Sequence, residues 1–538
     1  MAAWVAIGFV AAFALAVLIP ATSLLEPDDY AYRAAILALS QGHLWLTNSQ
    51  YLAMAHHFAT LDGGHSAGIT QWVHQANGHW ISEKNPGYPF FAVVFQWLHL
   101  TRLIPVFYGA LASLALYLGG RRWLGRWGGT LAVGLFLSSG AALVFGWRWT
   151  MPTFTDASLV ATGIGLPLWS CLADDASRRR RGVVGLLGLL ALDGAVFCRY
   201  TDVAILLLAL VAIVLVSLLA KEVIPRRQLA WWLGVQVLVG AGLLGTNAAL
   251  YGSATKTGYS TGEITFSLSA ISGNLSVMPS PLARAMPVLV LAVIALVVAP
   301  VLYLVRRRQP ERRGLASRDL VIVAVLGAMF LAVFGLYLCY DWTAQMGSHV
   351  GGPGGGHGGP AGGHGGPGGG GGYVHLIRFY VPALAPMALL GAWLLTRIPT
   401  WIGFVVLAGL ITMGAASYHT MSASGAADGG IPGGAPGALG GHGDGGRTGT
   451  KAGCPTLPDG ARMPPGGFTP PSGGGGPQRP SGGAGGFAPP SGGSGSTQAP
   501  GNGGAGTAPS GPSGGRQGGM PKIPRRCLPA GAATGVGR

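Results

Sequence analysis

Acidic residues gather directly after the first apolar block of the chain. Glu26, Asp28 and Asp29 place three carboxylates within four residues. Ionised side chains beside a membrane are costly unless they are solvated, paired or used. A carboxylate in such a place can take a proton from an attacking hydroxyl, as a general base. The alternative is structural: Asp28 or Asp29 caps the helix expected over residues 30–42.

A lysine stands in a second polar segment of the same loop. Residues 78–89 read GHWISEKNPGYP, so Lys84 precedes a Pro-Gly-aromatic turn that includes Tyr88. An ammonium group at the level of lipid headgroups can hold a lipid phosphate as a point charge. The alternative is an ordinary lysine whose stem lies along apolar surface while its ammonium group reaches water.

The composition decides what kind of element must position these residues. Hydrophobic residues make up 49% of the chain and charged residues only 10%, and the mean hydropathy is +0.45. A soluble domain of this length could not cover its surface with so few charges. The apolar residues come in blocks of roughly 17 to 22, which is long enough to cross a bilayer as a helix.

We therefore expect an all-α polytopic membrane protein with about eleven membrane-spanning helices. The spans are expected near residues 3–20, 104–120, 128–146, 156–172, 183–198, 202–220, 229–250, 285–305, 320–339, 379–396 and 401–418. The first block lacks a basic region before it, so we interpret it as an uncleaved span rather than a signal peptide. Residues 89–100 are apolar but short, which indicates an interfacial helix.

Clusters of basic residues follow alternate apolar blocks. They are Arg121, Arg122 and Arg126, then Arg178–Arg181, then Lys221, Arg226 and Arg227, then Arg306–Arg308 with Arg312, Arg313 and Arg318. Cytoplasmic loops carry such an excess, so the formal charge of +16 reflects topology and not a nucleic-acid partner. We expect a multi-pass plasma-membrane protein with a cytoplasmic N-terminus. The loops around 147–155, 251–284 and 340–378 would then face outward.

The expected domains follow from these spans. Residues 1–420 form the membrane domain, which includes a first extracytoplasmic loop (21–103) and an outer loop rich in Gly and His (340–378). Residues 421–538 are dominated by Gly, Pro, Ser and Ala and predict a disordered extracytoplasmic tail. Neither the histidines nor the five cysteines have the spacing of a defined metal site. We expect no cofactor, although the sequence does not exclude that a divalent metal ion takes part in the reaction.

The order of the acidic and lysine segments resembles that of the GT-C-fold glycosyltransferases. The branch of protein O-mannosyltransferases and lipid A aminoarabinose transferases is the most similar. There an acidic pair and a tyrosine follow the first span, and here Asp28, Asp29 and Tyr32 match them. The later Glu-Lys-Pro-Pro segment of the family is matched by Glu83 and Lys84, with Asn85-Pro86 in place of the two prolines.

Three later segments extend the resemblance to the whole membrane portion. They contain Arg199 before Tyr200-Thr201-Asp202, Lys256 within residues 250–259 (LYGSATKTGY), and Arg378 before Phe379-Tyr380. The resemblance implies that these cations, with Lys84, bind the phosphate of the donor. The alternatives are that Arg199 pairs with Asp202 and that Lys256 and Arg378 face water. Asp156 stands at the start of its span and is interpreted as a helix cap.

The resemblance implies an inverting transfer of a sugar from a polyprenyl-phosphate donor to an envelope acceptor. Asp28 would act as the base with Asp29 beside it, and Tyr32, Glu83 and Tyr88 would contact substrate. The bilayer is the expected environment, and no nucleic-acid partner is implied. Two other classes compete with this hypothesis: a transporter or lipid flippase, which would show buried mid-span charges and an internal repeat, and a non-catalytic cell-surface scaffold.

Overall fold

The apolar blocks of the chain form helices, because a helix satisfies every backbone hydrogen bond within one segment. The computed structural model describes residues 1–19, 27–61, 71–75, 77–220, 222–259, 265–306, 310–341, 343 and 376–428. These residues all belong to one unit, Met1–Ala438. The predicted tail beyond residue 428 and most of the predicted loop 340–378 lie outside the described residues.

Each predicted span overlaps helical residues. The helices are α1 (Ala2–Leu18), α5 (Ile104–Leu137), α6 (Gly140–Trp147), α7 (Thr153–Leu172), α8 (Arg178–Cys198), α9 (Val203–Leu219), α10 (Arg226–Tyr251), α13 (Val288–Arg306), α14 (Pro310–Leu338), α17 (Leu384–Leu395) and α18 (Thr400–Asp428). Among the described residues, seven helices are long and apolar enough to cross a membrane, and Ala2–Leu18 and Val381–Leu395 are shorter apolar helices. The prediction of a helical, polytopic membrane protein is confirmed. The last helix extends eight residues past the predicted domain boundary at 420.

Gly125 divides α5 into two halves that correspond to the predicted spans near 104–120 and 128–146. Its φ of 82° is non-helical and lies in the left-handed region that favours glycine. The chain folds back at this point, since a Cβ at Gly129 would lie 2.6 Å from the carbonyl oxygen of Tyr117. Small residues thus let the two halves pack with their backbones in contact.

The prediction of one continuous helix over 128–146 is wrong. The chain leaves the helix at Ser138 and Ser139, and α6 starts at Gly140. The hydroxyl of Ser139 donates to the carbonyl oxygen of Ala285, 3.1 Å away. The hydroxyl of Ser138 donates to the carbonyl oxygen of Gly134, 2.6 Å away, and local bonds of this kind compete with the helical hydrogen-bond ladder and favour a break.

Helix α7 forms the centre of the bundle. It packs against α5, α8 and α17, and nearly all of its side chains are buried. Its Thr, Ser and Gly residues contact other helices, and for this reason α7 is less apolar than the helices that face outward. Phe154 at its start stacks on Phe13 of α1, with ring centroids 4.8 Å apart.

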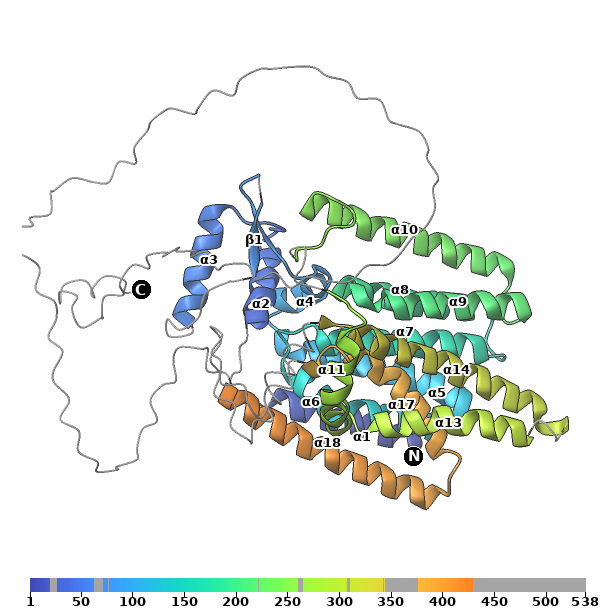
Figure 1. The fold of residues 1–538 in the computed structure, drawn as a ribbon. Helices are drawn as coiled ribbons and strands as arrows, with labels where there is room; N and C mark the ends of the chain where they lie inside the picture. Colours follow the sequence, from blue (N-terminus) through green and yellow to red (C-terminus); the bar gives the residue numbers. More distant parts are fainter. Residues whose placement is uncertain are drawn as a thin grey trace, which may run out of the picture. The chain divides into compact units, whose positions relative to one another are not determined.

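Smaller elements gather at one end of the long helices (Figure 1). They are α2 (Pro27–Ser40), α3 (Asn48–Leu61), β1 (Trp72–His74), β2 (Trp80–Ser82), α4 (Gly87–Trp97) and the 3₁₀ helix η1 (Thr101–Leu103). The two strands pair antiparallel. Later in the chain come η2 (Tyr200–Asp202), α11 (Ala270–Val277), α12 (Pro279–Ala285) and η3 (Val381–Ala383). The predicted helices over 30–42 and 89–100 correspond to α2 and α4.

Candidate active site

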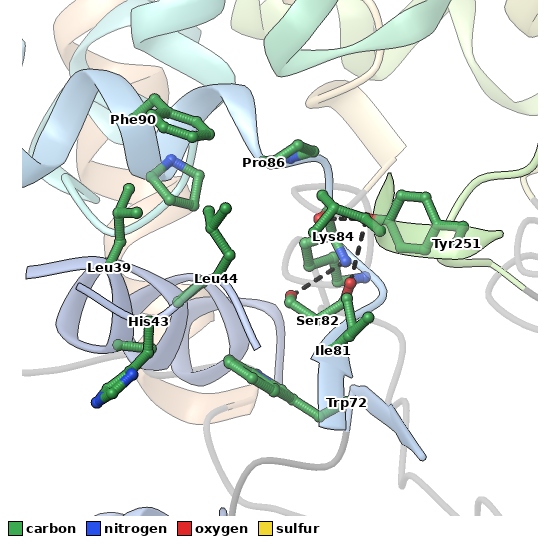
Figure 2. A pocket seen from close by; sticks show the side chains of 14 residues that line it. Leu39, His43, Leu44, Trp72, Ile81, Ser82, Lys84, Pro86, Phe90 and Tyr251 are labelled. Atoms are coloured by element: carbon green, nitrogen blue, oxygen red, sulfur yellow. Dashed lines mark hydrogen bonds between the residues drawn. The ribbon is translucent and has the colours of Figure 1, made fainter. Parts of the chain in front are cut away.

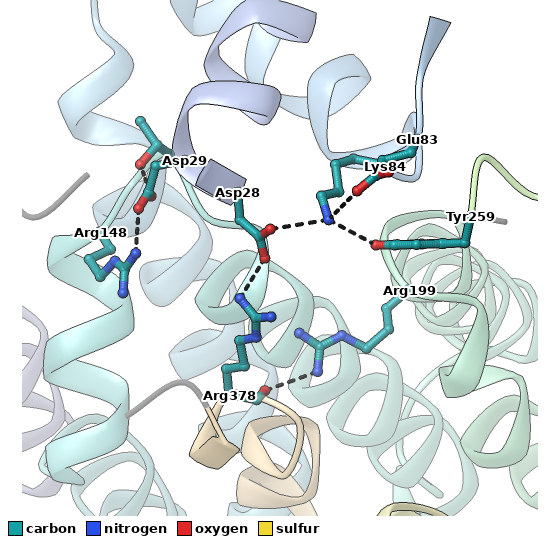
Figure 3. A network of polar contacts seen from close by, with 9 residues as sticks. Asp28, Asp29, Glu83, Lys84, Arg148, Arg199, Tyr259 and Arg378 are labelled. Carbon is teal, nitrogen blue, oxygen red and sulfur yellow. Dashed lines mark hydrogen bonds and ion pairs between the residues drawn. The ribbon is translucent and has the colours of Figure 1, made fainter. Parts of the chain in front are cut away.

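Asp28 is held by two cations from distant parts of the chain. Its Oδ1 lies 3.1 Å from Nζ of Lys84, and its Oδ2 accepts a hydrogen bond of 2.5 Å from Nη1 of Arg378 (Figure 3). Helix α2 begins at Pro27, so Asp28 and Asp29 stand in its first turn and neither of them is the N-cap. The start of α2 is thereby joined to the segment just before η3 and α17.

Lys84 is almost fully buried and contacts three oxygen-bearing side chains. Besides Asp28, its Nζ lies 3.1 Å from Oε1 of Glu83 and donates to the hydroxyl of Tyr259 over 3.4 Å. Tyr259 reaches this position because Gly258 packs directly on the backbone of Glu83, where a Cβ would overlap the Cα atom. The close approach of the Thr257–Tyr259 backbone to Glu83 therefore requires glycine at residue 258.

Arg199 is a third cation of the site, and it connects Arg378 to helix α7. Its Nη1 donates to the carbonyl oxygen of Arg378 over 2.9 Å, and its Nε lies 3.3 Å from Oδ2 of Asp156. Asp156 is completely buried in the first turn of α7, whose N-cap is Pro152, so its interpretation as a helix cap is wrong. The alternative ion pair of Arg199 with Asp202 is not the one formed. A buried arginine instead selects the carboxylate on the neighbouring helix.

Contacts behind Lys84 fix its backbone between two helix ends. Asn85 donates from Nδ2 to the carbonyl oxygen of Cys198 over 3.1 Å. The hydroxyl of Tyr251 lies 3.3 Å from the carbonyl oxygen of Ser82 and 3.4 Å from that of Lys84. The apolar gap beside them has only about 30 Å³ of free space, which suits little more than a water molecule (Figure 2).

The ion pairs set the charge states of the site. Burial raises the pKa of Asp28, but the guanidinium of Arg378 and the ammonium group of Lys84 outweigh it and hold this pKa well below its usual range. Burial lowers the pKa of Lys84, but the Asp28 carboxylate and its neighbours outweigh that effect and raise it. Both residues are therefore charged at neutral pH.

These side chains line a cavity of about 860 Å³. Its charged lining residues are the carboxylates Asp28 and Glu83 and the cations Lys84, Arg199, Lys256 and Arg378. Tyr32, Tyr259, Tyr337 and Tyr340 add aromatic surface and hydroxyl groups. The volume is in the range of about 300–1,000 Å³ typical of small-molecule sites. The excess of cations over carboxylates favours an anionic ligand.

Two predicted site residues lie outside this cavity. Asp29 is completely buried, and its carboxylate accepts hydrogen bonds from Arg148 and Thr150 of the segment between α6 and α7. Tyr88 is also completely buried, and its hydroxyl donates to the carbonyl oxygen of Trp149. Both side chains hold α2 and α4 against the segment between α6 and α7, so neither lines the cavity.

The remaining predicted residues line the cavity in different ways. Tyr32 is buried in the wall, where its ring packs edge-on against Tyr88 with centroids 5.7 Å apart. Glu83 is mostly buried beside Lys84. Lys256 is exposed and, within the described part of the chain, forms no ion pair.

Sequence reasoning missed four residues that build the site. Arg148 and Thr150 bind Asp29, Asp156 binds Arg199, and Tyr259 binds Lys84. The arginine between two tryptophans in the short segment from α6 to α7 was a usable signal, because an ionised group so close to two spans requires a partner. No group of three or more His, Cys, Asp or Glu suited to a metal ion occurs among the residues that the structure describes.

The chain matches no protein-family model and no curated protein. Two solved structures are similar to it, both of ArnT from Cupriavidus metallidurans. With the apo crystal structure it shares 15% identity and a TM-score of 0.43, over 76% of this chain and 63% of that chain. With the structure bound to undecaprenyl phosphate it shares 14% identity and a TM-score of 0.43, over 76% and 64%. The chain thus spans less than two thirds of the length of that protein.

Proposed function

We propose that this protein is a membrane glycosyltransferase that moves a sugar from a polyprenyl-phosphate donor to an acceptor hydroxyl or amine. The observation that carries the proposal is the placement of Asp28 on the wall of the 860 Å³ cavity, between Lys84 and Arg378. This arrangement combines a carboxylate that can accept a proton with cations that can receive a phosphate. The order of the matching sequence motifs agrees with it.

The reaction needs one proton acceptor and one site for a departing phosphate. The acceptor oxygen or nitrogen attacks the anomeric carbon, and the bond between that carbon and the phosphate oxygen breaks. Asp28 takes the proton of the acceptor. The lipid phosphate leaves with an additional negative charge, which Lys84, Arg378 and Arg199 neutralise. A single displacement of this kind inverts the anomeric configuration.

The ion pairs of Asp28 suggest how donor binding prepares the base. With Lys84 and Arg378 on its two oxygens, the carboxylate is a weak base, because its pKa is held low. A donor phosphate in the cavity competes for the same two cations. As they turn to the phosphate, the carboxylate loses their stabilisation and its affinity for a proton rises. Donor binding would thus activate the base in the same step that positions the leaving group.

The rest of the cavity offers groups for the sugar and the acceptor. Glu83 can accept hydrogen bonds from sugar hydroxyls while it keeps Lys84 in place. Tyr32 and Tyr259 present polar edges and ring faces, which suit a saccharide. Lys256 is exposed at this cavity and would attract the anionic donor at longer range.

We also propose that the cavity opens on the extracytoplasmic side. Met151 and Thr153 line it at the start of α7, and Arg199 lines it at the end of α8. The arginine cluster Arg178–Arg181 stands at the opposite end of α8. The positive-inside rule places that end in the cytoplasm and the cavity outside.

The decisive experiment combines a transfer assay with two matched substitutions. The purified full chain is incubated with radiolabelled polyprenyl-phosphate sugars and with cell-envelope lipids, glycans and proteins as acceptors. We expect Asp28→Asn to reduce transfer at least about a hundredfold, the scale of a lost general base. The Asp28→Asn variant should still bind polyprenyl phosphate. The substitution removes the carboxylate that competes with the phosphate for Lys84 and Arg378.

Glu83→Gln is the control, since it removes another carboxylate of the same cavity that also contacts Lys84. We expect a much smaller loss of transfer than in Asp28→Asn. Full transfer activity in Asp28→Asn would refute the role of Asp28. The absence of transfer from every polyprenyl-phosphate sugar by the unmodified protein, despite binding of polyprenyl phosphate, would refute the assignment as a transferase.

A further inference from the structure

A second polar cavity lies at the other end of α7 and α8. It has a volume of about 380 Å³. Arg121 and Arg122 of α5 and Arg180 of α8 line its polar part, and Trp169, Leu166 and Leu187 line its apolar part. The cavity thus joins a cationic end to a wall of aliphatic and aromatic side chains. No residue of the candidate active site contributes to it.

The cations of this cavity outnumber the carboxylates that could neutralise them. Arg122 pairs with Asp175, its Nη2 lying 2.7 Å from Oδ1, and Asp175 is 66% exposed. Within the described part of the chain, neither Arg121 nor Arg180 forms an ion pair. The guanidinium of Arg180 lies 5.6 Å from the ring centre of Trp169. A cavity with this charge excess favours an anion.

The position of Arg180 makes the need for an anion greater. It stands in the first turn of α8, which contains four arginines and no acidic residue. The N-terminal end of a helix carries a partial positive charge, so cations there are unfavourable and anions favourable. A bound phosphate would offset the repulsion between these arginines and the positive end of α8. The positive-inside rule explains basic residues in the loop, but it explains neither the cavity nor the arginine over the tryptophan.

The apolar wall indicates where the anion comes from. Leu187 is 52% exposed on the outer surface of α8, and Val184 lies one turn before it. Leu187 is thus open to lipid in the membrane, and Val184 is half-buried beside it. An anion that carries a hydrocarbon chain would contact both the arginines and the apolar wall. A free phosphate would contact only the arginines.

We propose that this cavity binds the phosphate of an anionic phospholipid, with an acyl chain along Leu187 and Val184. The phosphate lies between Arg121, Arg122 and Arg180, beside the indole ring of Trp169. Anionic lipids are enriched where the positive-inside rule places this end, and basic pockets between helices are suited to them. The lipid site does not depend on the proposed transfer reaction.

The test measures lipid binding by the full-length protein in nanodiscs of defined composition. Phosphatidylglycerol in a phosphatidylcholine background is the probe, and its retention after purification and its effect on the thermal unfolding midpoint are the readouts. We expect the double variant Arg121→Gln, Arg180→Gln to bind it roughly tenfold more weakly or worse, from the loss of two phosphate contacts.

The matched control is Arg178→Gln, Arg179→Gln, which removes two charges from the same turn of α8 but does not alter the cavity lining. Its binding should stay near that of the unmodified protein. Equal losses in both double variants would overturn the proposal, because they would indicate surface attraction alone. Displacement of the lipid by millimolar inorganic phosphate would also overturn it, since the acyl chain would then contribute nothing.

A third variant keeps the proposal testable if the arginine variants fail to fold. Val184→Phe narrows the apolar part of the cavity and leaves every arginine in place. We expect it to lose bound phosphatidylglycerol and to become insensitive to that lipid in thermal unfolding. Undiminished lipid binding by Val184→Phe would contradict the cavity as the site.

Discussion

Arg378 donates to Asp28 over 2.5 Å, although 350 residues separate them in the chain. The hydrogen bond joins the first turn of α2 to the segment just before η3 and α17. It also means that the proposed base and the proposed phosphate ligands neutralise one another before any substrate arrives. In the proposed mechanism, donor binding rearranges this ion cluster, and several experiments can detect the rearrangement.

Lys84 and Lys256 were equivalent candidates in the sequence, but the structure separates them. Lys84 is almost fully buried and bound to Asp28, whereas Lys256 is exposed. We expect Lys84→Ala to raise KM for the donor about ten- to a hundredfold, the scale of a lost charged hydrogen bond. Lys256→Ala should change it by less than about threefold, since exposed charges interact weakly.

Steady-state kinetics with varied donor concentration measures both effects. Circular dichroism of each purified variant provides the control for folding. A larger effect of Lys256→Ala than of Lys84→Ala would contradict the role of Lys84 as a phosphate ligand.

The pH profile should report the ion pairs of Asp28. Transfer requires the ionised carboxylate, so the rate falls as the pH falls through its pKa. In the free protein this pKa lies below its ordinary value of 3.8, so kcat/KM should have no acidic limb from Asp28 between about pH 5 and 8. The pKa of Lys84 is raised above 10.5, so loss of its charge should not limit kcat/KM in this range either.

The profile of kcat should differ, because it reports the substrate complex. If the donor phosphate takes Lys84 and Arg378 away from Asp28, the acidic limb of kcat moves to higher pH than that of kcat/KM. Lys84→Ala should move the limb of kcat/KM in the same direction, since one cation is lost before substrate binds. Identical profiles for kcat and kcat/KM would contradict activation of the base by the donor.

Much of the fold could be predicted from the sequence because membrane spans are encoded locally. A run of apolar residues requires a helix in the bilayer whatever the rest of the chain does. The break at Ser138–Ser139 was not predicted, because two serines inside an apolar run are also compatible with a continuous helix, and the contact of Ser139 with Ala285 is remote in sequence. The low hydropathy of α7 likewise reflects contact with other helices.

The candidate site was predicted less completely, and the errors have one cause. Asp28 and Asp29 are adjacent and alike in sequence, yet one lines the cavity and the other binds Arg148 outside it. Successive residues of a helix point in different directions, and only the neighbouring elements decide which direction faces the cavity. The pairing of Arg199 with Asp156 instead of Asp202 is another contact that spacing alone does not specify.

Gly258 offers a test of the loop that carries Tyr259 to Lys84. A Cβ at this residue would overlap the Cα of Glu83, so Gly258→Ala must displace the loop. We expect kcat/KM to fall about tenfold, the scale of one lost hydrogen bond to a charged group. Gly245→Ala on α10 is the control, because no atom lies within 4 Å of the added Cβ. If both alanine variants are equally active, the loop does not position Lys84.

The ion pair between Asp29 and Arg148 should contribute to stability and not to chemistry. Both side chains are buried, so Asp29→Asn removes a buried carboxylate that binds the Arg148 guanidinium and should lower stability by about 3–5 kcal/mol. Arg148→Met should have a similar effect. The double variant Asp29→Leu, Arg148→Met should lose much less than the sum of the two, because it buries no unpaired charge.

Unfolding of the purified variants in detergent measures these differences, and transfer per folded molecule distinguishes structure from catalysis. We expect the Asp29→Asn protein that remains folded to keep most of its transfer activity, whereas the Asp28→Asn protein should lose it. A stable Asp29→Asn protein that has lost transfer would instead make Asp29 part of the reaction. It would then act through its neighbour, since its own carboxylate is closed off from the cavity by Arg148 and Thr150.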